Sequence, residues 1–524
     1  MKRRPLSYPA LALAAVVLLP SLRSADPDLW ELARRNAAVH RFSTLFTAHD
    51  VRKHLASEAG IDQALAWCKA TAVTKVYMEN FRDGVDVDPA LLRHARDRFR
   101  EAGFEVSGGI TTTSVGRRSN RWNIIACYTD GPTQDRVERM STVAAGLFDE
   151  IMVDDFWFTE CSCSQCDEAR KARRVTVGGR ATEVSGDTWE DYRGELMLRM
   201  SVEKLIGPAK KANPRCRVIV KYPQWYDAFH ERGYDVVEQT RVFDRIWVGT
   251  ETRDYSDPQW GGTVQYEAYF IMRWLGGIGG GKCGGGWFDW LGTTERTYLE
   301  QARQTVLGGA RETTLFCYGG LQGQTGPKNI TAFRGEVPAL FALATEVGRR
   351  TPKGIAAYKP PGSPPGADKR VFDFVGMLGL PLVPCHEFPT NASAAFFSLH
   401  AMKDPAFPAN LARYLDAGHA VLLTDTLSSA LPQDVLAGRR KVGVLPVRGD
   451  PKRVMELEPG VLDSLREPLL SALGIRFRAP AKVQLVLFSD GSRVVSNFRD
   501  EPVEVELDGG KETVPARGWV QRWR

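Results

Sequence analysis

Eight strand-like runs, separated by helix-like stretches, occupy residues 40–345 and constrain the fold more than any other feature of the sequence. Amphipathic helices are predicted between these runs, at 89–103, 195–212 and 298–310. Strands that alternate with helices predict a parallel sheet, and eight such units predict a closed (β/α)8 or TIM barrel of the α/β class. The strand-like runs are residues 42–48, 75–81, 104–112, 150–158, 217–223, 245–252, 284–290 and 312–319.

The chain of 524 residues is too long for one compact core, and its pattern changes after the barrel. A Pro- and Gly-rich stretch at 352–369 predicts a linker or a surface loop, and the α/β alternation after it predicts a smaller, flavodoxin-like domain. Apolar and polar residues alternate from Lys482 onward around an Asp490-Gly491 turn, which predicts an antiparallel β domain. The predicted division is a signal peptide at 1–25, a barrel at 26–350, a flavodoxin-like domain at 351–480 and a β domain at 481–524.

The first residues have the pattern of a secretory signal. Basic residues 2–4 precede a short apolar run at 11–19, and small residues at 24–25 offer a cleavage point. The run is too short to span a bilayer comfortably, with a retained anchor as the alternative. We therefore expect an exported protein, periplasmic or extracellular, with no stable membrane span once the signal is removed.

The charge of the chain gives no support for nucleic-acid binding. The formal net charge is +6, and Lys2, Arg3, Arg4 and Arg23 of the predicted signal contribute four of the positive charges. The remaining basic residues form no clustered stripe, which nucleic-acid binding would require.

Four of the nine cysteines have a spacing that suits a metal ion. Cys161, Cys163 and Cys166 lie within six residues, and Cys127 precedes the predicted fourth strand. Four thiolates suit Zn²⁺ in a structural, tetrahedral site with no open position for water. A disulfide among these residues with a leftover thiol is the alternative. No organic cofactor is expected.

Carboxylates follow several of the predicted strands, at the face where such barrels hold their active sites. Asp154 and Asp155 follow the fourth strand, and because successive side chains of a strand point to opposite faces, only one of them should enter the pocket. We favour Asp155. Glycoside cleavage needs a second carboxyl group. The partner is predicted to be Glu251 first, Asp289 second and Glu79 third.

Other polar and aromatic residues near strand ends are candidates for substrate contacts. Lys221, Tyr222 and Arg253 could hydrogen-bond sugar hydroxyls or a uronate, and tryptophans could stack on sugar rings. The glycine-rich stretch 275–286 lacks a phosphate-binding motif, so we expect a lid or tight packing at the barrel mouth. The predicted substrate-binding residues are Glu79, Trp157, Lys221, Tyr222, Trp225, Arg253 and Trp287, with Trp247 as a further stacking candidate.

With one cysteine after the third strand and C-x-C-x-x-C after the fourth, the chain resembles the glycoside hydrolase family 42 β-galactosidases and their barrel relatives. These enzymes carry a flavodoxin-like and a small β domain after the barrel, and many are trimers, so the resemblance implies this order and a homotrimer. The catalytic residues match less well. The family places Asn-Glu after its fourth strand and Glu after its seventh, where this chain has Asp154-Asp155 and Asp289. Other barrel glycosidases pair Asp on the fourth strand with a carboxylate on the sixth, an arrangement that Glu251 fits.

The sequence therefore predicts a secreted glycoside hydrolase that cleaves oligo- or polysaccharide with a pair of carboxylates. Because fold alone does not fix chemistry, a lyase or deacetylase on the same scaffold is an alternative. A divalent metal at the carboxylates would favour it. The other alternative is a barrel that binds carbohydrate without cleaving it.

Overall fold

The computed structural model describes residues 28–253 and 264–524. The signal peptide predicted for residues 1–25 lies outside the described residues. Within them, no helix combines the length and the apolar character that a membrane crossing requires.

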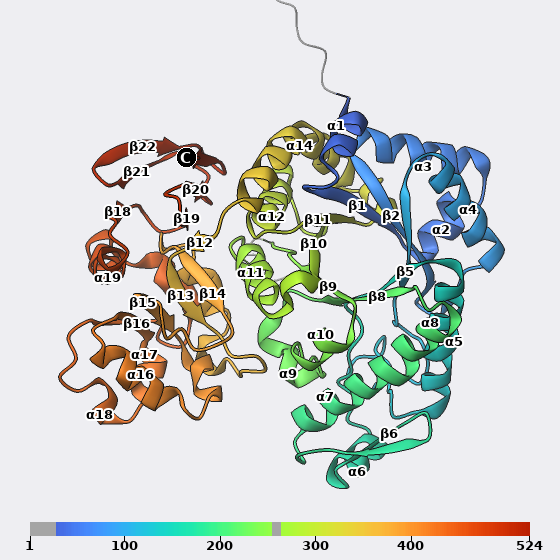
Figure 1. The fold of residues 1–524 in the computed structure, drawn as a ribbon, viewed down its shortest axis with the longest axis horizontal. Helices are drawn as coiled ribbons and strands as arrows, with labels where there is room; N and C mark the ends of the chain where they lie inside the picture. The colour runs from blue at the N-terminus through green and yellow to red at the C-terminus, as the bar shows by residue number, and fades with distance from the viewer. Residues whose placement is uncertain (1–27, 254–263) are drawn as a thin grey trace, which may run out of the picture.

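Eight parallel strands close into a barrel, as the sequence predicted (Figure 1). The first strand pairs with both the second and the last, so the sheet has no open edge at this point. The strands are, in order around the barrel, β1 (Arg41–Phe46), β2 (Val73–Arg82), β4 (Glu105–Ile110), β5 (Glu150–Val153), β8 (Arg217–Tyr222), β9 (Arg245–Gly249), β10 (Cys283–Asp289) and β11 (Glu312–Phe316). A short strand, β3 (Val85–Asp86), pairs antiparallel with β2.

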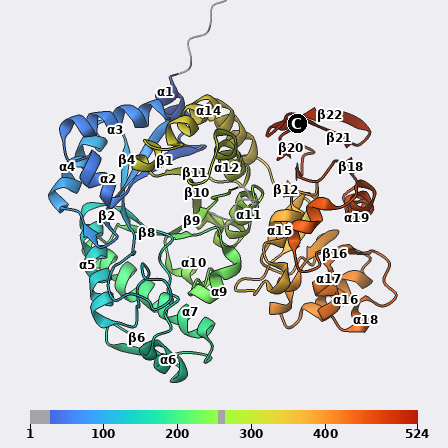
Figure 2. The same cartoon turned by 180° about the vertical axis from the view of Figure 1, so that it is seen from behind.

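Helices surround the strands on the outside of the barrel (Figure 2). The helix predicted at 195–212 is interrupted, because a π-helical segment at Ser201–Ile206 separates α7 from α8. The barrel helices are α1 (Leu29–Asn36), α2 (Ala48–His54), α3 (Glu58–Ala70), α4 (Pro89–Glu101), α5 (Gly131–Leu147), α6 (Ser164–Lys171), α7 (Trp189–Met200), α8 (Gly207–Ala212), α9 (Phe229–Arg232), α10 (Glu238–Val242), α11 (Glu267–Gly279), α12 (Glu295–Leu307), α13 (Tyr318–Leu321) and α14 (Gly326–Gly348).

Large side chains fill the inside of the barrel, so it is a packed core rather than a pore. This interior cluster consists of Leu45, Tyr77, Met152, Ile219, Trp247, Trp287 and Cys317. The glycines of β10 make room for it, since a Cβ on Gly284 would lie 2.2 Å from the Trp247 ring. The prediction of a lid or packing at the barrel mouth for residues 275–286 was therefore wrong. This stretch ends α11 and starts β10, at the opposite end of the barrel from the strand ends that carry the carboxylates.

An ion cluster closes the end of the barrel at which the strands begin. The Lys75 ammonium lies 2.7 Å from Glu150 Oε1 and 3.1 Å from Glu312 Oε2. Ser43 and Tyr77 also donate hydrogen bonds to Glu312. Because all these groups are buried, the cluster ties four strands together with paired charges.

A second, smaller sheet follows the barrel and has five parallel strands in the order β14-β13-β15-β16-β17. This is the order 2-1-3-4-5 of flavodoxin-like sheets, as the sequence predicted. Its elements are β13 (Ile355–Tyr358), α15 (Val371–Val375), β14 (Leu382–Cys385), β15 (Ala394–Phe397), α16 (Phe407–Asp416), β16 (Ala420–Thr424), α17 (Asp425–Ala430), α18 (Gln433–Leu436), β17 (Val442–Leu445) and α19 (Pro459–Ala472).

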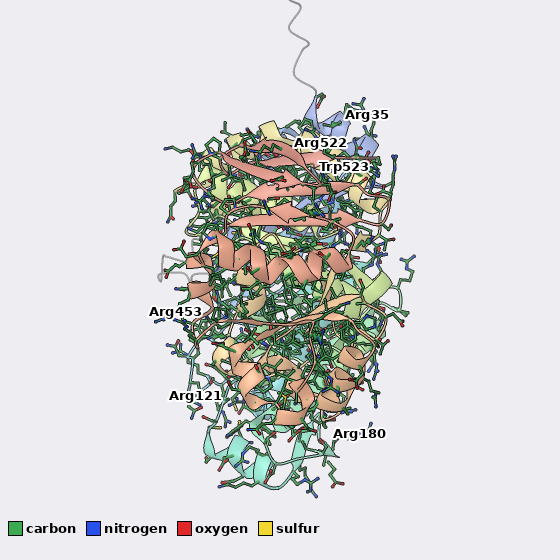
Figure 3. The ribbon with its side chains drawn as sticks, turned by 90° about the vertical axis from the view of Figure 1, so that its left-hand side faces the viewer. Arg35, Arg121, Arg180, Arg453, Arg522 and Trp523 are labelled. Carbon is green, nitrogen blue, oxygen red and sulfur yellow. The ribbon has the colours of Figure 1, made fainter. Side chains whose placement is uncertain are left out.

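Two small antiparallel sheets complete the chain and stack beside the second sheet along one side of the barrel (Figure 3). The predicted linker at 352–369 contributes to both units, because it contains β13 and the two-residue strand β12 (Pro352–Lys353), which pairs with β19. The reading of the whole stretch as a linker was therefore wrong. The strands are β18 (Phe477–Arg478), β19 (Val483–Phe488), β20 (Arg493–Asn497), β21 (Val503–Leu507), β22 (Gly510–Val514) and β23 (Trp519–Arg522).

We expect replacement of Lys75 by Met to destabilise the fold by about 3–5 kcal/mol, because it leaves buried Glu312 without its cation and leaves buried Glu150 only its pair with the exposed Arg217. Chemical denaturation measures this change. The control is Lys511→Met, which removes an exposed ion pair with Glu504 and should leave the midpoint unchanged. Equal midpoints for Lys75→Met and wild type would contradict the role of the cluster.

Candidate active site

Charged side chains gather where the barrel strands end. Glu79 and Arg82 belong to β2, Lys221 to β8 and Asp289 to β10, while Asp154, Asp155, Glu251 and Arg253 follow β5 and β9 directly. The predicted strand 150–158 was too long, since β5 ends at Val153 and both aspartates lie in the loop that follows. The carboxyl ends of parallel strands meet at one face, so these residues share the barrel mouth.

Asp154 is held between two cations. One of its oxygens accepts hydrogen bonds from Arg82 Nη2 (2.6 Å) and Thr111 Oγ1 (2.9 Å), and the other accepts one from Lys221 Nζ. Burial alone would raise the pKa of Asp154, but the charges of Lys221 and Arg82 outweigh it and hold the pKa well below its ordinary value. Asp154 is therefore an ionised bracing residue, as the sequence predicted for one aspartate of the pair.

The neighbouring Asp155 has the opposite electrostatic environment. Burial, the charge of Asp154 and the charge of Glu251 all raise its pKa well above the ordinary value, and Lys221, at 3.9 Å, opposes this only in part. The backbone at Asp155 is fixed because its carbonyl accepts a hydrogen bond from Tyr234 Oη at 2.5 Å. The side chain keeps 17% of its surface exposed, so it combines a raised pKa with access to the mouth.

Glu251 is the other partly exposed carboxylate of the mouth, with 13% of its side-chain surface exposed. Its Oε1 accepts a hydrogen bond of 2.8 Å from the indole of Trp287, and its Oε2 lies 3.7 Å from Arg253 Nη2. The indole hydrogen bond and the nearby guanidinium orient this carboxylate at the mouth.

Asp289 and Glu79, the second and third predicted partners, are each bound on both oxygens. Arg253 Nη2 lies 2.8 Å from both oxygens of Asp289, and burial together with the Glu251 charge raises the pKa of Asp289 to about 8. Arg82 binds Glu79 through two bonds of 2.8 Å, and the Ala48 amide donates a third. Both side chains are at least 96% buried, so neither presents a free oxygen to a substrate.

Most of the predicted substrate-binding residues serve other purposes. Trp157 is fully buried and donates to Ser201, while the Tyr222 hydroxyl bonds to Thr240 on the outer side of the barrel. Trp247 and Trp287 fill the barrel interior. The predictions of sugar contacts for these four residues were wrong, because burial leaves no ring face for a sugar.

The basic residues proposed as sugar contacts are taken up by ion pairs. Lys221 is 97% buried between Asp154 and the Trp287 ring, whose centroid lies 4.0 Å from its ammonium. The Arg253 guanidinium binds both oxygens of Asp289. Trp225 is half-buried under the guanidinium of Arg232, at 4.3 Å, and remains at the rim of the mouth.

Sequence reasoning missed Arg82, Thr111 and Tyr234. Arg82 stands three residues after Glu79 at the same strand end, a spacing that could have suggested the ion pair. A bulge between Glu79 and Phe81 disturbs the simple alternation there. Thr111 directly follows β4, so the strand-end rule used for the carboxylates could have indicated it, whereas Tyr234 comes from the loop between α9 and α10 and its local sequence gives no such signal.

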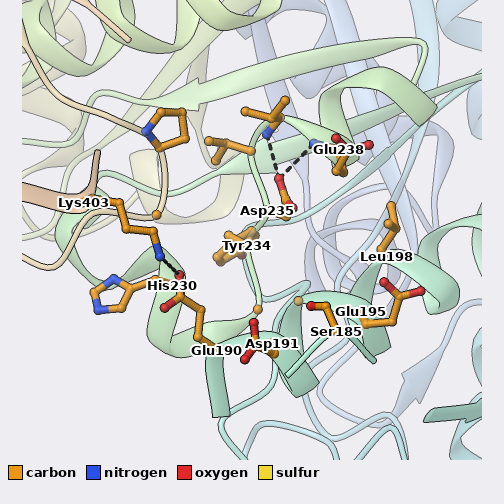
Figure 4. Close-up of a pocket in the computed structure, with 16 residues that line it drawn as sticks. Ser185, Glu190, Asp191, Glu195, Leu198, His230, Tyr234, Asp235, Glu238 and Lys403 are labelled. Carbon is orange, nitrogen blue, oxygen red and sulfur yellow. Dashed lines mark hydrogen bonds and ion pairs between the residues drawn. The ribbon is translucent and has the colours of Figure 1, made fainter. Parts of the chain in front are cut away.

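A pocket of about 410 Å³ lies beside the mouth, between the barrel and the second sheet's unit (Figure 4). Five of its sixteen lining residues are acidic, but carboxylates among them are already engaged, for example Glu190 with Lys403 at 3.1 Å and Glu195 with Arg199 at 2.6 Å. Tyr234 also lines this pocket, and its hydroxyl reaches Asp155. The carboxylates of the strand ends do not line it, so we place the reaction at the barrel mouth.

The four cysteines predicted to form a metal site come together in the loops after β4 and β5. Their sulfur atoms all lie within 4.8 Å of one another, with spacings of 3.5 Å (Cys127 to Cys166) and 3.6 Å (Cys163 to Cys166). A tetrahedral zinc with sulfur at about 2.3 Å requires sulfur atoms about 3.8 Å apart, whereas a disulfide needs about 2.05 Å. All nine cysteines are free, and the donor set fits a metal ion.

Polar residues around the four cysteines also favour a metal site. Arg117 Nη2 lies 2.8 Å from Cys127 Sγ and 3.4 Å from Cys163 Sγ, and the Thr129 hydroxyl lies 3.1 Å from Cys166 Sγ. Cation and hydroxyl donors of this kind stabilise thiolates, which are the metal-binding form of cysteine.

Comparisons with known proteins agree with the fold and place the chain in a family. The model of the family described as "probable glycosyl hydrolase, catalytic domain" matches residues 28–346. An uncharacterised protein of Saccharolobus solfataricus is 29% identical over 281 residues, which are 50% of this chain. The match covers 46% of that relative, so the chain aligns with less than half of its length.

Two solved structures share the fold over almost the whole chain. The α-L-fucosidase isoenzyme 2 of Paenibacillus thiaminolyticus superposes with a TM-score of 0.64 over 92% of this chain and 98% of its own, at 10% identity. The exo-β-1,4-mannosidase of Opitutaceae bacterium strain TAV5 reaches a TM-score of 0.50 over 93% and 86%, also at 10% identity. At such identities the likeness concerns the fold alone.

We expect the purified protein to contain about one metal ion per chain, because four thiolates in a tetrahedron bind a divalent ion tightly. Elemental analysis measures the content. Cys163→Ser should lose most of the metal, whereas Cys385→Ser, a half-buried thiol in β14 outside the cluster, should keep it. A metal-free wild type with four titratable thiols in the cluster would contradict the metal site.

Proposed function

We propose that this chain, which belongs to the family of probable glycosyl hydrolase catalytic domains, hydrolyses O-glycosidic bonds in oligo- or polysaccharides. One observation carries the proposal. Of the carboxylates that the described strand ends bring to the mouth, Asp155 and Glu251 are partly exposed, whereas Asp154, Glu79 and Asp289 are buried in ion pairs. A pair of accessible carboxyl groups is the minimum that glycoside hydrolysis requires.

The electrostatics of the mouth assign different roles to the two groups. Asp155, with its raised pKa, is suited to donate a proton to the leaving-group oxygen as the glycosidic bond breaks. Glu251, which Trp287 and Arg253 orient and which is partly exposed, is placed to act as nucleophile or as base toward water. If Glu251 is the nucleophile, water supplies the hydroxyl group of the released sugar and gives its proton back to Asp155. If Glu251 is the base, it takes the proton of the attacking water, and proton exchange with solvent then restores both carboxyl groups.

This assignment departs from the family 42 resemblance. That resemblance places the nucleophile at Asp289, but both oxygens of Asp289 bind Arg253. We assign the role of nucleophile or base to Glu251 instead, which follows β9, the sixth strand of the barrel. Membership of family 42 itself and the trimer that it implies stay predictions.

We also propose that the metal of the cysteine cluster is zinc and that its role is structural. Four protein ligands leave no position for a reacting water, and thiolates suit zinc. Zinc would supply rigidity to the loops after β4 and β5 and no chemistry to the reaction. Export to the periplasm or the cell exterior, from the signal pattern of residues 1–25, completes the proposal.

We expect a screen of glycans and aryl glycosides to reveal sugar release by wild type. Asp155→Asn and Glu251→Gln should each lower kcat/KM by about 100-fold or more, because each removes a group that acts in the transition state. Asp155→Asn should lose far less on an activated aryl glycoside, whose leaving group needs no proton. Glu183→Gln, in the β6 (Arg174–Val177) and β7 (Arg180–Glu183) hairpin, is the control.

Sugar release that survives both substitutions would show that the site is wrongly assigned. No sugar release from any glycan by wild type would favour the non-catalytic binding protein or another reaction on the same barrel.

The pH dependence should reveal Asp155. Activity on a glycoside with a poor leaving group falls as pH rises through the pKa of Asp155, because only the protonated acid can donate. Asp154→Asn removes the neighbouring charge that raises this pKa, so the alkaline limb should move to lower pH by about one unit. A kcat/KM profile for wild type and variant measures this shift, and an unmoved limb would contradict the coupling.

A further inference from the structure

We infer that Trp122 is a stacking platform for a sugar ring outside the bond-cleaving pair, and that the cysteine cluster holds this platform in place. The inference rests on the proposed action on saccharides and extends it to a binding subsite and its support. The ligand class is a pyranose ring of a glycan chain, which presents C–H groups to an aromatic face and hydroxyls to water.

The Trp122 side chain is unusually exposed for a tryptophan. It is 39% exposed, although the other large aromatic residues of the surrounding loops are buried or half-buried. It is not isolated, because its ring centroid lies 5.9 Å from Phe156 and 6.2 Å from Phe158. An exposed ring supported from behind by other rings presents a fixed apolar face, which is what a sugar ring needs as a platform.

This aromatic group is continuous with the proposed acid. Phe156 follows Asp155 in the chain, and its carbonyl accepts a hydrogen bond of 2.9 Å from Thr112 Oγ1. Phe158 packs edge-on against Trp225 with centroids 5.2 Å apart. A glycan held on Trp122 would therefore lie along the rim that leads to Asp155.

Two loops must stay together for this arrangement to exist. Trp122 lies between β4 and α5, whereas Phe156 and Phe158 lie after β5. Few backbone bonds connect the loops directly, and the cysteine cluster joins them, since Cys127 belongs to the first loop and Cys161, Cys163 and Cys166 to the second.

Polar contacts next to the cluster complete the connection. Asn120 Oδ1, two residues before Trp122, accepts a hydrogen bond of 2.9 Å from the Ser162 amide. The Thr159 hydroxyl donates to the Ala126 carbonyl at 3.2 Å. These two contacts lie next to the cysteines. Loss of the metal would weaken the connection between the two loops and displace the Trp122 ring from Phe156.

The test is affinity electrophoresis of the full chain in native gels that contain mannan, galactan, xylan or β-glucan. Wild type should be retarded by at least one polysaccharide. Trp122→Ala should weaken the binding about tenfold, and Trp122→Phe, which keeps a ring, should retain most of it. Val461→Ala removes another exposed apolar side chain, on α19, and should bind like wild type.

Removal of the metal from wild type with a chelator should weaken binding as Trp122→Ala does, and should weaken the Trp122→Ala variant no further. Acrylamide quenching of tryptophan fluorescence should rise on chelation in wild type more than in Trp122→Ala. These two readouts do not depend on whether a cysteine variant folds.

The outcomes separate this inference from the proposed function. Equal retardation of wild type and Trp122→Ala overturns the platform and leaves hydrolysis standing. Loss of retardation in Trp122→Ala, with no hydrolysis by wild type, supports the platform and overturns the hydrolase. A wild type that none of the four polysaccharides retards, or chelation without effect on binding, contradicts the inference.

Discussion

The ion pairs of Asp154 with Arg82 and Lys221 determine the electrostatics of the whole barrel mouth. They bring together groups from β2, β8 and the end of β5, and they keep Asp154 ionised in a buried place. Because this charge lies next to Asp155 in the chain, the second carboxyl group retains its proton more readily than an ordinary aspartic acid. The pKa values of two adjacent residues of the same type are thus shifted in opposite directions, and Asp155 is the one of the two whose side chain keeps more exposed surface at the mouth.

The loops above the barrel depend on a separate constraint. The aspartates follow a strand of only four residues, and the chain then runs without regular structure to α6. The cysteine cluster at the end of this segment limits its freedom and joins it to the preceding loop. The barrel core therefore positions the carboxyl groups, while the cluster positions the aromatic rim around them. A site built on both has a reaction centre fixed by the barrel strands and a binding surface fixed by the linked loops.

The barrel and the flavodoxin-like sheet could be predicted from the sequence, because strand and helix periods are local properties. The carboxylates could be placed at strand ends for the same reason. The sequence could not show which carboxylates stay accessible to a substrate. This depends on the ion pairs that Arg82 and Arg253 form, and strand periodicity does not predict the partners of these arginines. The burial of Trp157 was missed because the chain leaves the sheet after Val153, whereas the sequence pattern of residues 150–158 does not show where the strand ends.

The central claim is that Asp155 carries a proton where Asp154 does not, and infrared difference spectroscopy tests it most directly. The difference at neutral pH between wild type and Asp155→Asn isolates the absorption of one side chain and cancels that of the other buried acids. The account predicts the loss of a protonated carboxylic acid band in the variant. Loss of carboxylate bands alone would mean that Asp155 is ionised, and would contradict its role as the acid.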